Sequence, residues 1–274
     1  NMTMTTSLPD VSALRDFRPE LVALDLDDTL IGHGGIVPHE AVEAIARLKG
    51  MGIEVVASTG RSFGTTAPVC AAAGIESWAV CSNGAMLAAL EPEEIVETIT
   101  FDPADLLTAI QQRVPNGMYA VEDPTGVFRT NVMFNHSALT EGIREVSFEE
   151  LLHTPVIRVV VRSDDHLDEG LGHVAADLGL HSVVFGVAEV AWLDIGPQGV
   201  SKATMLQRLC DRLGIDRANT LAIGDSMNDI AMLEWAGRGV LMGHAVPEMH
   251  VHADVLTSER PGYGVADALN AIGS

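Results

Sequence analysis

Short apolar runs alternate with helical patterns near both ends of this chain, and this alternation restricts the fold more than any other feature. The runs at 21–26 and 53–57 are as short and as apolar as strands that are buried on both faces. Between them, Pro38 opens a helical pattern that Gly50 and Gly52 close. Strands and helices in this order form a parallel, doubly wound α/β sheet, so we expect a Rossmann-like core.

The alternation stops near residue 84 and returns after Gly196. Between these points, alternating strand-like runs and helical patterns indicate an inserted α+β domain. The patterns predict further strands at 78–81, 156–161, 182–187, 220–223 and 239–242, and helices at 67–73, 103–113, 165–178, 200–213, 229–235, 246–252 and 265–272. With 274 residues, the chain also exceeds one typical core. We therefore expect a core made of 1–84 and 191–274, with an inserted α+β domain at 85–190.

The charge balance is strongly acidic, with 16 Lys and Arg against 38 Asp and Glu and a formal net charge of −22. Such a chain repels nucleic acids and anionic membranes, so we expect neither as a partner. No apolar run approaches the roughly 20 residues that cross a bilayer. The first ten residues lack the basic and apolar segments of a signal peptide. Because the three cysteines form no CxxC motif, we expect a reducing, cytoplasmic environment.

Polar side chains stand where the apolar runs end, and in an open α/β sheet that edge binds ligands. Asp25 and Asp27 lie at the end of the first run, and residues two apart on an extended segment face the same way. Two neighbouring carboxylates can divide into a nucleophile and a proton-transfer group. Asp is also common in turns after strands, so this segment alone leaves both interpretations open.

Three other segments complement these carboxylates. Residues 58–61 (Ser-Thr-Gly-Arg) end the second run with hydroxyl and N–H groups that suit phosphate oxygens, although a capped turn has the same pattern. Lys202, one of only two lysines, begins a predicted helix, where the helix dipole disfavours a cation. Residues 224–229 follow another apolar run, and their two outer carboxylates, together with Asp25, offer the oxygen ligands that Mg²⁺ prefers.

Taken together, these motifs resemble those of phosphatases of the haloacid dehalogenase superfamily, within it the Cof-type branch with a large C2-type α/β cap. The matching stretches are 24–30, 58–61, 82–85, 199–202, 224–229 and 262–265. The resemblance covers the whole chain, with the cap matching in position and length only. The motifs are specific for the superfamily and say little about the substrate.

The resemblance implies a Mg²⁺-dependent phosphatase that forms an aspartyl-phosphate. Asp25 would attack phosphorus, Asp27 would protonate the leaving alcohol and then activate water, and Lys202 would balance the charge. The implied phosphate-binding residues are Thr29, Ser58, Thr59, Gly60, Arg61, Lys202 and Asn228. The implied metal ligands are Asp25, the main-chain carbonyl of Asp27 and Asp225, with Asp229 supporting them.

Two residues depart from the pattern of that branch. Asp28 stands where the branch usually has Gly, and because Asp tolerates turn conformations we expect little effect on the chemistry. His244 stands where the branch commonly has Asn, and we assign it no role. The cap is expected to close over the site and choose the substrate. Its polar side chains, Arg158 and Arg162 among them, are left without a role because alternate residues of an amphipathic strand face solvent.

Three functions are compatible with these residues. The favoured one is hydrolysis of a small phosphorylated metabolite, such as a sugar phosphate. A phosphomutase shares this kind of core, but it would interconvert isomers without net release of phosphate. A non-catalytic binding protein would be favoured by the loss of a catalytic carboxylate, and none is missing. The sequence predicts neither the metabolite nor an oligomeric state.

Overall fold

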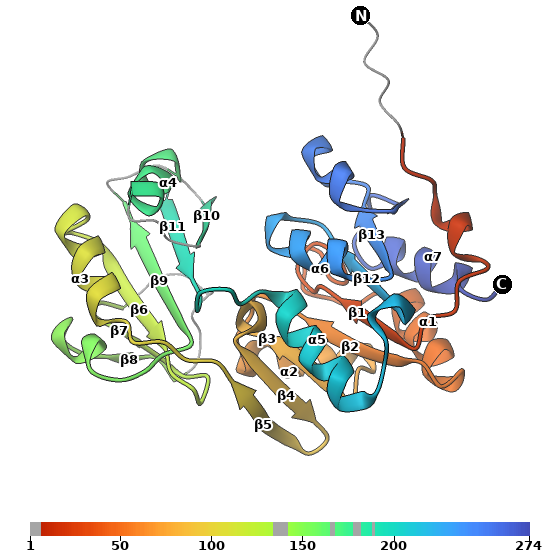
Figure 1. Ribbon diagram of the computed structural model, residues 1–274, viewed down its shortest axis with the longest axis horizontal. Helices are drawn as coiled ribbons and strands as arrows, with labels where there is room; N and C mark the ends of the chain where they lie inside the picture. Colours follow the sequence, from red (N-terminus) through yellow and green to blue (C-terminus); the bar gives the residue numbers. More distant parts are fainter. Residues whose placement is uncertain (1–6, 134–141, 165–167, 178–181, 188–189) are drawn as a thin grey trace, which may run out of the picture.

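Two β-sheets with their own helices make up the computed structural model, which describes residues 7–133, 142–164, 168–177, 182–187 and 190–274 (Figure 1). The core sheet has eight strands in the order β14-β13-β12-β1-β2-β3-β4-β5. Its strands are β1 (Leu21–Leu24), β2 (Glu54–Ser58), β3 (Trp78–Cys81), β4 (Met86–Leu90), β5 (Glu93–Thr98), β12 (Thr220–Gly224), β13 (Arg238–Met242) and β14 (Val255–Thr257). From β14 to β3 in this order, each strand is parallel to its neighbour, as the strand–helix alternation predicts.

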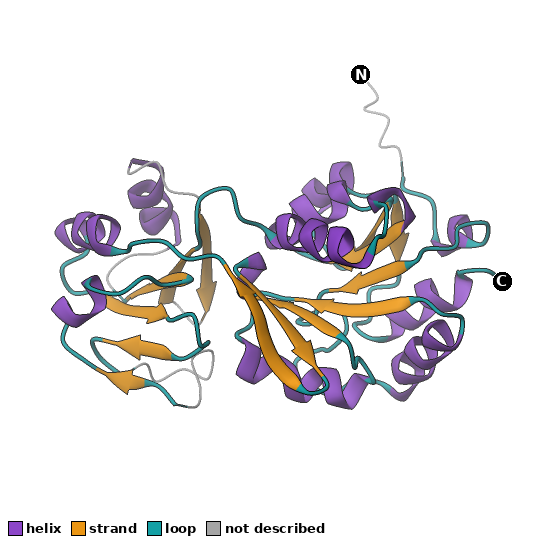
Figure 2. Ribbon diagram, turned by 60° about the horizontal axis from the view of Figure 1, so that its bottom comes forward, coloured by secondary structure: helices purple, strands orange, loops and turns teal. Residues whose placement is uncertain are grey.

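Helices cover both faces of the core sheet (Figure 2). They are α1 (His39–Gly50), α2 (Phe63–Ala73), α5 (Lys202–Leu213), α6 (Ile230–Trp235) and α7 (Tyr263–Ala271). Val22 and Leu24 of β1 pack in the hydrophobic cluster that contains α1, α2 and α7, whereas Leu21 and Ala23 pack in the cluster with α5 and α6. Every residue of β1 is buried, because its side chains alternate between two covered faces. The predicted doubly wound α/β fold is confirmed.

The second sheet, which we call the cap sheet, has six strands in the order β10-β11-β9-β6-β7-β8. They are β6 (Met118–Glu122), β7 (Phe128–Thr130), β8 (Arg144–Glu145), β9 (Arg158–Ser163), β10 (Ser182–Val187) and β11 (Val190–Ile195). One face packs against α3 (Ala104–Arg113) and α4 (Asp168–Asp177). The opposite face carries a smaller apolar cluster that includes Phe128, Val160 and Trp192. This is the inserted α+β unit that the sequence predicts.

The pairing of the strands places the borders between the two sheets elsewhere than the predicted domain boundaries at 84/85 and 190/191. Strands β4 and β5 form a hairpin that extends the core sheet, with β4 antiparallel to β3. Strand β11 pairs with β9 and so belongs to the cap sheet. The change of pattern near residue 84 therefore marks a change from parallel to antiparallel pairing within one sheet. An alternating apolar run predicts a strand but does not identify its partner.

Most predicted elements have observed counterparts with bounds that differ by a few residues. The segment at 246–252 is helical as a 3-10 helix, Pro247–His252, rather than as an α-helix. The helix predicted at 165–178 corresponds to α4, and the remaining residues of that range lie outside the described ones. Among the described residues, no helix is both long and apolar enough to cross a membrane.

Candidate active site

The parallel register of three central strands brings the predicted motifs to one edge of the core sheet. Leu24, the last residue of β1, lies opposite Ile223 of β12 on one side and Ala57 of β2 on the other. The residues that follow these positions therefore leave the sheet together. Asp25, the segment starting at Ser58 and the segment starting at Gly224 meet at the carboxyl edge, where an open α/β sheet binds its ligands.

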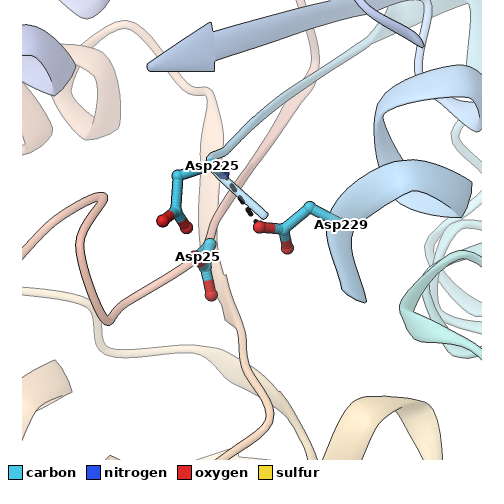
Figure 3. A group of neighbouring side chains, drawn as sticks. All are labelled: Asp25, Asp225 and Asp229. Carbon is cyan, nitrogen blue, oxygen red and sulfur yellow. Dashed lines mark hydrogen bonds between the residues drawn. The ribbon is translucent and has the colours of Figure 1, made fainter. Parts of the chain in front are cut away.

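Three carboxylates form the centre of this site (Figure 3). Asp25, Asp225 and Asp229 each present an oxygen within 4.8 Å of the others. Asp229 Oδ2 accepts hydrogen bonds from the N–H groups of Asp225 at 2.9 Å and Ser226 at 3.2 Å, which fixes the strand-to-helix turn after β12. The Thr29 hydroxyl lies 3.1 Å from Asp25 Oδ2 and 3.2 Å from Asp225 Oδ1. The structure thus brings four residues of the predicted site together.

Lys202 supplies the positive charge within the cluster. It is the first residue of α5, is 0% exposed, and donates from Nζ to Asp25 Oδ1 at 2.9 Å and to Asp229 Oδ1 at 2.6 Å. The helix start is fixed separately by a capping box between Ser201 and Thr204. A cation at a helix N-terminus is unfavourable for the dipole, and the two buried carboxylates explain why this lysine is there.

The electrostatics of the cluster favour a divalent cation. Burial raises the pKa of Asp25 to about 7 although Lys202 opposes the shift, and burial raises the pKa values of Asp225 and Asp229 to about 6. Burial alone would lower the pKa of Lys202, but Asp229 and Asp25 hold it above its ordinary value. Three ionised carboxylates and one ammonium leave two negative charges uncompensated in a buried site. Carboxylate oxygens are the donors that Mg²⁺ takes, so this set of residues fits that ion.

Asp27 is not among the three clustered carboxylates and pairs with Arg61. Arg61 donates from Nε to Oδ2 at 2.8 Å and from Nη2 to Oδ1 at 2.7 Å, in the two-point geometry that guanidinium and carboxylate favour. The Asp27 side chain is 56% exposed, so the pair faces the open side of the site. Arg61, predicted to bind phosphate, is placed as the partner of Asp27. No described donor contacts the main-chain carbonyl of Asp27, which leaves it available as the predicted metal ligand.

Two buried hydroxyls end the second strand and its turn. Ser58 Oγ is buried and has no hydrogen-bond partner among the described residues. Thr59 Oγ1 accepts a hydrogen bond from the Arg61 N–H at 3.0 Å, so the hydroxyl proton of Thr59 can still be donated to another acceptor. A buried hydroxyl without a partner is costly, and at this edge a phosphoryl oxygen would satisfy it.

Gly60 lies beneath a pair of asparagines. A Cβ at this position would lie 3.0 Å from Asn83 Oδ1 and 3.4 Å from Asn228 Nδ2, so the close approach favours glycine. Asn228 Nδ2 donates to Asn83 Oδ1 at 3.1 Å, which joins the loop after β12 to the loop after β3. No role for Asn83 was predicted from the sequence. The sequence feature that could have indicated this residue is the Asn-Gly pair at 83–84. Asn83 has a φ of 55°, in the left-handed region, which Asn tolerates better than most residues.

The two residues that depart from the family pattern touch each other. Asp28 has a φ of 60°, in the left-handed region, which explains why glycine is common there and why Asp is tolerated. His244 Nε2 lies 2.6 Å from the main-chain oxygen of Asp28, as a hydrogen bond requires. His244 therefore helps to hold the turn that follows Asp27.

A cavity of about 270 Å³ opens beside the cluster. It is lined on the core side by Lys202, Asn83 and Asn228 and on the cap side by Asp194. This volume lies just below the range of about 300–1,000 Å³ that is usual for small-molecule sites.

Comparison with known proteins agrees with this geometry. Residues 22–269 match the family model of the haloacid dehalogenase-like hydrolases. The chain belongs to this family. The resemblance that the motifs indicated is confirmed, as is the prediction that the chain is an enzyme of the hydrolase class.

Individual relatives are moderately similar along nearly their whole length. The pyridoxal phosphate phosphatase YbhA of Escherichia coli is 28% identical, with 90% of this chain and 96% of that protein covered. The HMP-PP phosphatase of Citrobacter koseri is 26% identical, with 84% and 86% covered. The structure of a haloacid dehalogenase-like hydrolase from Bacillus subtilis has a TM-score of 0.76 at 26% identity, with 92% of this chain and 99% of that chain covered.

Proposed function

We propose that this hydrolase is a Mg²⁺-dependent phosphatase of a small phosphomonoester and that the phosphoryl group passes through Asp25. The observation that carries the proposal is the placement of the Asp25 carboxylate. It is buried beside the Lys202 ammonium and within 4.8 Å of two further carboxylates, next to hydroxyls that are free to donate. The names of the relatives as phosphatases support the same reaction.

Asp25 is the nucleophile in this proposal. One of its oxygens attacks phosphorus, the bond from phosphorus to the leaving oxygen breaks, and an aspartyl-phosphate remains. Lys202 favours the ionised carboxylate that this attack needs, against the opposing effect of burial. The hydroxyls of Ser58 and Thr59 donate to the phosphoryl oxygens, and Lys202 offsets their charge. Positioning and charge compensation supply most of the catalysis, as in other phosphoryl transfers.

Asp27 moves the protons. It gives a proton to the leaving oxygen in the first step, and in the second it takes one from the water that attacks phosphorus. The aspartyl-phosphate is thereby hydrolysed and both carboxyl groups return to their starting states. In the structure both Asp27 oxygens accept hydrogen bonds from Arg61, so in this proposal Asp27 gives up at least one of these bonds when it carries the proton for the leaving oxygen.

A bound Mg²⁺ would be held by Asp25, Asp225 and the carbonyl of Asp27, with Asp229 in support. When bound, the ion would compensate negative charge on the phosphoryl oxygens and on the carboxylates. Asp229 has a second task, because it accepts the Lys202 hydrogen bond and so keeps the ammonium directed at Asp25.

The test is phosphate release from a panel that contains sugar phosphates, nucleotides, pyridoxal phosphate and flavin mononucleotide. The assays are run with Mg²⁺ and with EDTA, on the wild type, on Asp25→Asn, and on Asp105→Asn, which removes an exposed cap carboxylate as a control. The proposal predicts Mg²⁺-dependent release that only Asp25→Asn abolishes. Interconversion of isomers without release of phosphate would identify a mutase. The absence of both reactions with every compound would favour a binding protein.

A further inference from the structure

Three charged side chains lie on one face of the cap sheet, where it meets the core. Glu122 on β6 is the register partner of Arg158 on β9. Asp194 on β11 is opposite Val160, two residues beyond Arg158 and so on the same face. This is the face without α3 and α4; it also carries the apolar cluster with Phe128, Val160 and Trp192 and, farther along β9, Arg162, whose guanidinium lies over the Trp192 ring. Ionisable groups on such a surface need specific partners.

Glu122 is a fixed anchor in this group. It is 0% exposed and its Oε1 accepts from Arg158 Nε at 3.0 Å, with Arg158 Nη2 at 2.8 Å from the same oxygen. The Ser82 hydroxyl lies 2.7 Å and 3.0 Å from the two carboxylate oxygens of Glu122. Ser82 belongs to the core and has a φ of 50°. This backbone conformation is unfavourable for serine and is kept only where surrounding contacts hold it. Glu122 therefore ties the cap sheet to the core at this point.

The opposite edge of the Arg158 guanidinium reaches the phosphate loop, which we define as residues 58–61. Arg158 Nη1 donates a hydrogen bond to the main-chain carbonyl of Gly60, and it lies 3.4 Å from Asp194 Oδ2. The guanidinium also lies over the Phe128 ring, 5.3 Å from its centroid. With these contacts the side chain is only 8% exposed. A guanidinium held this way has one orientation available.

The Gly60 carbonyl needs such a partner because glycine restricts its own backbone less than any other residue. No described residue accepts a hydrogen bond from the Gly60 N–H, which leaves this donor available beside the hydroxyls of Ser58 and Thr59. Asn83 and Asn228 limit Gly60 on the Cα side. Arg158 restricts the movement of Gly60 on the carbonyl side. The phosphate loop is therefore held by residues of both the core and the cap.

We propose that Arg158 is a positioning residue for phosphoryl transfer: anchored on Glu122, it holds the Gly60 carbonyl and sets the phosphate loop for the incoming phosphoryl group. The inference rests on the proposed function. In this role Arg158 acts through Gly60 and not on the leaving group. Loss of the Arg158 side chain should therefore affect every substrate alike.

The main variant is the double substitution Glu122→Gln with Arg158→Met. Arg158→Met alone would leave a buried, unpaired carboxylate and could unfold the cap, whereas the double variant removes both charges. Arg158→Lys is the second variant, because its ammonium stays opposite Glu122 but cannot bond Glu122 and Gly60 in the same geometry. Arg113→Met is the control, since Arg113 pairs with the exposed Asp177 within the cap, at 3.0 Å.

Two readouts test the role. One is kcat and KM on substrates with neutral and anionic leaving groups, and the other is binding of inorganic phosphate in the presence of Mg²⁺, measured by calorimetry. We expect kcat to fall on the order of 10- to 100-fold for all substrates, and phosphate to bind on the order of 10-fold more weakly, in both Arg158 variants. Inorganic phosphate has no leaving group, so a residue that only recognises the leaving group would not change its affinity. Arg113→Met should match the wild type.

Wild-type kcat and wild-type phosphate affinity in a folded double variant would overturn the inference, and so would a rise in KM confined to anionic leaving groups. If the double variant fails to fold, Arg158→Lys gives the same comparison. The proposed function is tested separately by the wild type alone. Absence of phosphate release from the wild type would reject that function, whereas an active wild type with equally active Arg158 variants would reject only the positioning role.

Discussion

Replacement of Lys202 by Met removes the cation at the centre of the site while keeping a side chain of similar length. In the wild type the ammonium is 0% exposed and bonds two buried carboxylates, of Asp25 at 2.9 Å and of Asp229 at 2.6 Å. Removing one partner of a buried pair typically costs about 3–5 kcal/mol, because the other charge stays buried without compensation. Here two carboxylates lose their shared partner, so we expect the upper part of that range at pH 8.

The cost should depend on pH and on Mg²⁺. Because the pKa values of Asp25 and Asp229 are raised to about 7 and about 6, both carboxylates can take up protons at pH 5 and so reduce the uncompensated charge. The loss of stability in Lys202→Met should therefore be smaller at pH 5 than at pH 8. Mg²⁺ should restore part of the stability at pH 8, but not the activity, since Lys202 also directs the nucleophile. We expect kcat to fall on the order of 100-fold or more.

Urea unfolding followed by circular dichroism, at both pH values with EDTA or Mg²⁺, measures these differences. Lys49→Met is the matched control, because Lys49 is the only other lysine in the chain. Lys49 bonds the Gly74 carbonyl at 2.9 Å and Glu76 at 3.0 Å, and its side chain is 33% exposed, so its loss should cost no more than about 1 kcal/mol. Equal stability of the two variants at pH 8 in EDTA would refute the reasoning.

Two further predictions concern stability. The folded-state pKa values of Asp25, Asp225 and Asp229 lie above their ordinary 3.8, so metal-free protein should lose stability as the pH rises from about 4 to about 7, where the unfolded chain binds fewer protons. Thermal melts in EDTA should show this fall and Mg²⁺ should diminish it; a melting temperature that rises through this range in EDTA would contradict it. Gly84→Ala should cost more than about 3 kcal/mol or prevent folding, because its Cβ would lie 1.9 Å from the Ser201 carbonyl oxygen at a φ of 98°. Gly50→Ala, at the end of α1 with nothing within 4 Å of the added atom, should instead be neutral or stabilising by up to about 1 kcal/mol, and equal urea midpoints for the two variants would argue against this account.

The core and the centre of the site were predictable because local patterns determine them. Buried parallel strands have continuous apolar runs, and their carboxyl ends meet at one edge, so Asp25 and the 224–229 segment could be placed together from the sequence. Lys202 could be singled out because a lysine at a helix N-terminus, in a chain with only two lysines, needs a specific partner. The structure supplies that partner in Asp25 and Asp229.

Contacts between distant segments were less predictable, because no local pattern specifies them. The strand at Met86–Leu90 lies beyond residue 84, where the strand–helix alternation stops, yet it pairs with β3 in the core sheet. The sequence suggested a phosphate contact for Arg61, whereas the structure pairs it with Asp27. Arg158 resembled any polar residue on an amphipathic strand, and its contacts with Glu122 and Gly60 depend on how the cap meets the core.

The central claim is that the phosphoryl group passes through the Asp25 carboxylate, and trapping that group tests it most directly. Wild-type enzyme is mixed with a ³²P-labelled substrate from the panel, quenched in acid within the first turnover, and digested to locate the label. The account predicts acid-stable, alkali-labile label on the peptide that contains Asp25, and no label on Asp25→Asn. Label on another residue, or label that persists in Asp25→Asn, would contradict it.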